Sequence, residues 1–156
     1  MMVIPGFRGY KLRELRRESD KLIRNRLHHR LTASIDDLKT IYQRLVDNRL
    51  TDVWKDMDRL VARLETVSEA INHASYGYSG FFDAVKIQEA RLDVMLDYDS
   101  RMLDDVERIS SEVEAYKADV LNGDFTDTRT HIRAVGDAVE RLDTVYTERR
   151  NAILGV

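Results

Sequence analysis

Residues 50–74 read LTDVWKDMDRLVARLETVSEAINHA and carry the clearest structural signal in the chain. Their apolar side chains follow one another by alternating steps of three and four residues, which places them along one side of an α-helix. This seam comprises Leu50, Val53, Met57, Leu60, Leu64, Val67, Ile71 and Ala74. Trp54 and Val61 widen the apolar stripe, so the helix is expected to pack against more than one neighbour. Unbroken spacing of this kind is typical of coiled-coil-like packing in bundles.

The sequence before this stretch predicts another, longer helix. It is expected to begin near residue 9 or 10 and to reach about residue 47, with a regular apolar seam from Leu31 onward. Ser34 followed by Asp37 imitates a capping box, so a break there is the alternative to the continuous helix that we favour. Residues 1–9 are expected to form a disordered or extended arm.

The sequence after this stretch predicts two further helices. One is expected over about residues 81–121, where Asn122 and Gly123 end it, and the other begins after a cap within residues 124–127. Short turns make sequential helices antiparallel neighbours. The predicted fold is therefore all-α: one domain over residues 1–156, an elongated up-down antiparallel bundle of about four helices with coiled-coil-like seams.

The predicted helix lengths indicate a staggered monomer. The first and third helices are each roughly 60 Å long and the second and fourth roughly 35–40 Å, at 1.5 Å per residue. If the turns align, a basic single helix (about residues 10–25) extends from one end and a hairpin over residues 103–129 from the other. Residues 1–30 hold nine Lys/Arg against three acidic residues, whereas residues 103–129 hold eight Asp/Glu against three Lys/Arg. We therefore expect a homo-oligomer in which the basic end of one chain meets the acidic hairpin of another.

The composition excludes several classes of protein. The 156 residues include no cysteine, which excludes a disulfide scaffold and a thiolate nucleophile and fits a cytoplasmic location. No apolar run approaches the roughly 20 residues that span a bilayer, and the first residues lack the features of a secretory signal. The net charge of −3 argues against a nucleic-acid partner.

A basic N-terminal stretch is the first candidate interaction surface. It comprises Arg8, Lys11, Arg13, Arg16, Arg17, Lys21, Arg24, Arg26 and Arg30. Such a helix can contact another protein or an anionic membrane surface. Arg26 and Arg30 fall on the same arc as apolar residues, and nearby acidic residues neutralise part of the charge, so the simplest membrane helix is disfavoured.

An aromatic turn is the second candidate. It comprises Tyr76, Tyr78, Phe81 and Phe82, next to Gly77 and Gly80. Aromatic side chains anchor interfaces, but they also fill the ends of bundles. We favour a structural plug, with a contact site as the alternative.

No catalytic, cofactor or metal site is predicted. No Glu-x-x-His pair of a di-iron bundle, nucleophile elbow or phosphate-binding loop occurs. The Glu69–His73 pair and the adjacent carboxylates Asp104 and Asp105 are expected to be solvated. The predicted function is a non-enzymatic helical assembly or adaptor protein that acts through self-association or protein contacts. The alternative is a peripheral membrane-surface protein that binds anionic lipid through its basic N-terminal helix.

Overall fold

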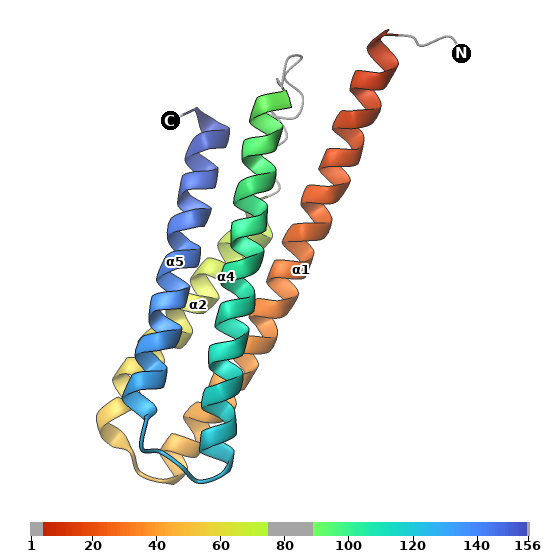
Figure 1. The fold of residues 1–156 in the computed structure, drawn as a ribbon. Helices are drawn as coiled ribbons and strands as arrows, with labels where there is room; N and C mark the ends of the chain where they lie inside the picture. Colours follow the sequence, from red (N-terminus) through yellow and green to blue (C-terminus); the bar gives the residue numbers. More distant parts are fainter. Residues whose placement is uncertain (1–4, 75–88, 156) are drawn as a thin grey trace.

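The computed structural model describes residues 5–74 and 89–155, and within these ranges the chain is built from α-helices and one short 3₁₀ turn (Figure 1). The elements are α1 (Pro5–Asp47), η1 (Thr51–Val53), α2 (Trp54–His73), α4 (Glu89–Leu121) and α5 (Thr128–Leu154). The predicted all-α fold is confirmed.

The four helices form an up-down bundle. α2 returns antiparallel to α1, α4 runs in the direction of α1, and α5 returns beside α4 (Figure 1). α1 packs against α2 and α4, and α5 packs against α4 and α2, so the helices enclose one core. The interior comes from the predicted seams. Met57 and Leu64 of α2, for example, are fully buried, and Trp54 and Val61 are half-buried at its edge.

Two chain reversals at the lower end in Figure 1 are closed by left-handed residues. Gly123 ends α4 with a φ of 76°, as the Asn-Gly sequence predicts. The amide of Asp124 donates to the carbonyl of Asp119 at 2.9 Å, which is the long hydrogen bond of a Schellman motif. Arg49 plays the same part after α1 with a φ of 59°, a conformation that costs a residue with a Cβ about 1 kcal/mol.

α1 differs from the prediction at its beginning. It begins at Pro5, whereas residues 1–9 were expected to form an arm; residues 1–4 lie outside the described residues. Proline suits the first helical position because its ring presets φ and the amide hydrogen it lacks has no partner there. The helix continues through Ser34, which is buried, so the favoured continuous helix is confirmed.

The predicted acidic overhang is wrong. Lys117 of α4 lies 2.8 Å from Asp37 of α1, and Arg129 of α5 lies 2.8 Å from Asp52 in the turn after α1. The two lower turns are therefore level, and together they line a small cavity of about 240 Å³. Ile109, which was expected to need cover from another chain, is fully buried within this one, as are Val113 and Tyr116.

The error comes from the height at which α4 begins. Arg30 pairs with Glu107, so Glu89, 18 residues before Glu107, lies level with residue 12 of α1. The contacts of α2 with α1 place His73 level with about residues 23–31 of α1. Glu89 therefore lies more than about 15 Å further along the bundle axis than His73. The prediction instead aligned the two helices at a turn near Gly77.

Candidate interaction surface

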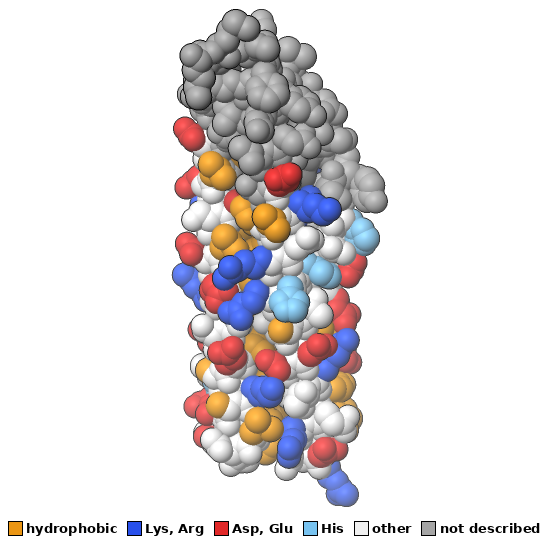
Figure 2. Space-filling view, turned by 90° about the vertical axis from the view of Figure 1, so that its right-hand side faces the viewer, with side chains coloured by type: hydrophobic (Ala, Val, Ile, Leu, Met, Phe, Trp, Pro, Cys, Tyr) orange, Lys and Arg blue, Asp and Glu red, His pale blue; other side chains and the backbone are white. Residues whose placement is uncertain are grey.

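An open cleft lies between α1 and α4 on the described surface. It has a volume of about 880 Å³. Its walls are formed by Leu22, Ile23, Arg26, His29 and Arg30 of α1 and by Leu103, Asp104 and Glu107 of α4. We call this the α1/α4 cleft. Figure 2, which faces α1, shows hydrophobic side chains gathered high on the described surface, with Lys, Arg and His side chains close by.

The cleft has an apolar floor and two charged edges. Leu22 leaves 68% of its surface exposed. Ile23 and Leu103 are half-buried against the core. Cationic groups lie along the α1 edge and carboxylates along the α4 edge. A mixed surface of this kind, apolar at the centre and charged at the rim, is typical of protein contact sites.

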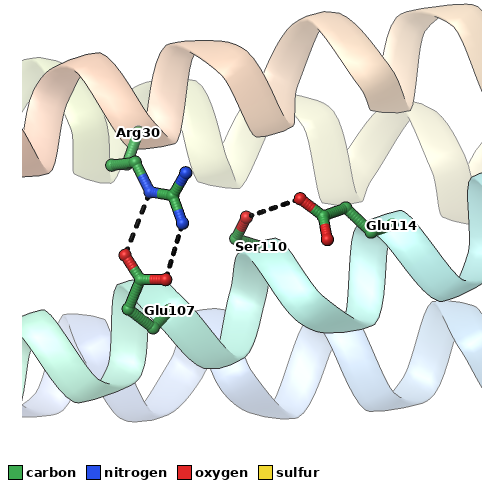
Figure 3. Close-up of polar contacts among 4 residues, drawn as sticks. All are labelled: Arg30, Glu107, Ser110 and Glu114. Carbon is green, nitrogen blue, oxygen red and sulfur yellow. Dashed lines mark hydrogen bonds and ion pairs between the residues drawn. The ribbon is translucent and has the colours of Figure 1, made fainter.

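One hydrogen-bonded ion pair bridges the lower end of the cleft. Arg30 donates from Nε to Glu107 at 3.0 Å and from a terminal nitrogen at 2.6 Å (Figure 3). The hydrogen bond and charge of Glu107 raise the pKa of Arg30, and the Arg30 hydrogen bond lowers the pKa of Glu107. Both side chains are more than a third exposed, so the pair contributes little stability, but it shows the height of α4 beside α1.

A second polar contact lies one turn further down α4. Ser110 is buried, and its hydroxyl lies 3.5 Å from a carboxylate oxygen of Glu114 on the same helix (Figure 3). At this distance the hydrogen bond is weak. Glu114 also adds to the field that raises the pKa of Arg30. The acidic edge of α4 thus continues below the cleft.

The residues of the predicted basic surface lie in different environments. Lys21 and Arg26 are exposed, and Arg30 is held by Glu107. The side chains of Arg8, Lys11, Arg13, Arg16 and Arg17 lie outside the described part of the chain. Arg24, also predicted as part of this surface, is only 9% exposed and so offers a partner little of its side chain. Its position on α1 faces the bundle interior, whereas Arg26 faces the cleft.

A buried ion pair lies inside the bundle, near the height of Arg24. Arg149 of α5, 1% exposed, donates from Nε to a carboxylate oxygen of Asp99 on α4 at 2.6 Å. Asp99 interrupts the apolar seam of α4, and the pairing across two helices explains how a charge is held there. Two buried ions require such mutual compensation, because desolvating an isolated one costs several kcal/mol.

The burial of Asp105 differs from what the sequence predicted. Adjacent carboxylates at 104 and 105 were expected to be solvated, and Asp104 is exposed at the cleft, but Asp105 is only 5% exposed. Burial raises the pKa of Asp105, against the lowering effect of Arg108 and Arg101. Consecutive residues on a helix point about 100° apart, so one of the two can face water while the other faces α5 or the core.

An aromatic–histidine contact joins α4 to α5. The rings of Tyr116 and His131 stack with centroids 4.8 Å apart, and Nε2 of His131 lies 2.7 Å from a carboxylate oxygen of Asp119. Burial raises the pKa of the Tyr116 hydroxyl. Sequence reasoning missed this contact, although the two residues lie at similar distances on either side of the Gly123 turn, so an antiparallel hairpin brings them together. The arrangement tightens the hairpin.

The remaining candidates give no reactive constellation. Glu69 and His73 are 3.0 Å apart on the exposed face of α2, as the solvated interpretation predicts. Among the described residues, no three His, Cys, Asp or Glu side chains are placed to hold a metal ion. The aromatic turn, Tyr76, Tyr78, Phe81 and Phe82, lies outside the described residues, so plug and contact site both stay predictions.

Comparisons of this chain with protein-family models, with curated proteins and with solved structures find no match. None of the described helices combines the length and apolar character needed to cross a membrane. The surfaces of the chain itself are therefore the basis of a functional interpretation.

Proposed function

We propose that this protein is a non-enzymatic helical assembly or adaptor protein that acts through the α1/α4 cleft, by self-association or by contact with another protein. The observation that supports this is the exposure of Leu22 beside a half-buried Leu103, between cationic and carboxylate edges. Burying apolar surface supplies most of the affinity of protein contacts. A Leu that leaves most of its surface in water at such a cleft is available for that role.

The charge pattern favours a protein partner over a lipid surface. Asp104 and Glu107 line the same cleft as Arg26 and Arg30, so half of its charged edge would meet an anionic headgroup unfavourably. Arg30 is moreover already neutralised by Glu107. A protein surface can offer both signs of charge, whereas an anionic membrane offers one.

Self-association tests the proposal directly. We expect size exclusion with light scattering, at about 10–200 µM protein, to give a dimer or higher oligomer whose mass rises with concentration. Leu22→Glu should shift the population toward monomer because it places a charge in the apolar contact. Leu121→Glu is the matched control: Leu121 is 49% exposed at the lower end of α4, away from the cleft, and its replacement should leave the mass unchanged.

Two outcomes would contradict self-association through the α1/α4 cleft. A wild-type chain that stays monomeric at every concentration, at both low and high salt, would remove self-association as its mode of action. An oligomer that responds equally to Leu22→Glu and Leu121→Glu would show that association does not involve the α1/α4 cleft.

A peripheral membrane-surface role is the second candidate. The observation in its favour is that Lys21, Leu22 and Arg26 are all exposed near the N-terminal half of α1. Cosedimentation with phosphatidylserine-containing vesicles should then exceed that with phosphatidylcholine vesicles and fall as salt rises. Lys21→Glu should weaken this binding. Equal cosedimentation with both vesicle types would exclude anionic lipid as the ligand.

A further inference from the structure

The two edges of the α1/α4 cleft carry opposite charges at matched heights. The Arg30–Glu107 ion pair places these two residues level with each other on parallel helices. Arg26 lies four residues before Arg30, and Asp104 lies three residues before Glu107. Each helix rises 1.5 Å per residue, so Arg26 and Asp104 are also nearly level, about one turn further up.

Arg26 and Asp104 are both available to a partner. Each is exposed, and within the described part of the chain no ion pair joins one to the other across the cleft. Arg26 contributes to lowering the pKa of Glu107, so its charge acts toward the cleft rather than away from it. The cleft therefore presents a free cation on one edge and a free carboxylate on the other, on either side of Leu22 and Leu103.

The symmetry of a dimer decides which edges meet. If two clefts face each other across a twofold axis perpendicular to the helices, α1 lies against α1 and α4 against α4. That arrangement brings Arg26 near the cationic side chains on α1 of the other copy, and Asp104 near the carboxylates on α4 of the other copy. If the twofold axis is parallel to the helices, α1 of each copy lies against α4 of the other at the same height. Every charged edge then meets its complement.

We infer that a second copy of this chain docks on the α1/α4 cleft in a parallel, isologous dimer, with α1 of each copy against α4 of the other. This rests on the proposed function and specifies its partner and orientation. Leu22 and Leu103 supply the apolar contact at the centre, and the Arg26–Asp104 pairs between copies fix the orientation. Charges at a rim set register and partner choice more than affinity, because solvent and salt screen them.

A charge-exchange experiment tests the orientation. Arg26→Glu makes both edges acidic and Asp104→Arg makes both edges basic, so each variant alone should raise the dissociation constant of the dimer by about tenfold or more at low salt. Mixing the two variants should restore association, since each altered edge then meets an altered edge of opposite charge. The double variant Arg26→Glu/Asp104→Arg should also associate with itself about as strongly as the wild type.

Matched controls come from α5. Arg133→Glu and Asp137→Arg reverse the same kinds of charge on an exposed face away from the cleft, and they should leave the dissociation constant unchanged. The chain has no other cleft-lining Asp at the height of Arg26 among the described residues, so compensation is specific to this pair. Helix content and melting temperature, measured by circular dichroism, confirm that each variant is folded before its association is compared.

The possible results separate this inference from the proposed function. If Leu22→Glu dissociates the oligomer but mixing the two charge variants restores nothing, the cleft remains the contact surface and the parallel arrangement is wrong. If Arg26→Glu instead binds the wild type more tightly than the wild type binds itself, α1 faces α1 and the dimer is antiparallel. A monomeric wild type overturns the inference together with the proposed self-association.

Discussion

Replacing Leu64 with alanine measures how much the central seam stabilises the bundle. Leu64 lies in the middle of α2 and is completely buried, within the core that all four helices share. The substitution removes three buried carbon atoms, which at about 0.8 kcal/mol each corresponds to about 2.4 kcal/mol of lost transfer free energy. Neighbouring helices cannot collapse fully into the space left behind, so the total loss should be about 3–5 kcal/mol.

Equilibrium unfolding in urea gives the free energy of unfolding, and the circular-dichroism signal of the helices monitors it. We expect the midpoint to fall and the slope to stay unchanged, because the variant exposes nearly the same surface on unfolding. Leu121→Ala is the control: it removes the same atoms from a half-exposed position and should cost less than about 1 kcal/mol. Equal losses for Leu64→Ala and Leu121→Ala would refute the assignment of the seam to the core. Both variants should be measured at one protein concentration, since self-association also stabilises the folded state.

Three further experiments test other parts of the structure. Arg149→Met removes a buried cationic partner of Asp99 and should cost about 3–5 kcal/mol in urea unfolding. Adding Asp99→Leu should recover part of the loss, and no recovery would contradict the pairing. Burial raises the pKa of Asp105, so the folded state binds the proton of this carboxyl more tightly than the unfolded state does. The free energy of unfolding of the wild type should therefore fall, relative to that of Asp105→Asn, as the pH rises from about 3 to about 7. A pH-independent difference between the two proteins would show that Asp105 is solvated. Arg49→Gly relieves a left-handed residue that carries a Cβ and should raise the free energy of unfolding by about 0.5–1 kcal/mol, while a loss would mean that the Arg49 side chain stabilises the turn.

The sequence alone determined which apolar side chains of α2 form its part of the interior. The spacing of Met57, Leu60 and Leu64 is a property of the chain, because a helix turns by a fixed angle per residue and so collects these side chains on one side. Asn122 and Gly123 likewise determine where α4 ends, since glycine adopts a positive φ without a Cβ penalty. The buried side of the helix and the position at which it ends are therefore expected to be the same in any tertiary arrangement that buries the seam.

Tertiary structure decided how far each helix is shifted along its neighbours. A periodic seam shows which side of a helix is buried, but sliding that helix by one or two turns leaves the same side buried. Packing of the shared core sets the height of α4 beside α1, and contacts between residues far apart in the chain, such as Arg30 with Glu107 and Lys117 with Asp37, show what that height is. The predicted acidic overhang failed for this reason.

The same distinction applies to the candidate surface. The sequence identified a basic N-terminal stretch but could not separate Arg24, which faces the interior, from Arg26, which faces the cleft. It also gave no sign that Asp104 would lie opposite Arg26, because the two residues are 78 positions apart and meet only once α4 packs parallel to α1 at one height. A helical period places a charge on a face, and packing between helices decides what that face meets.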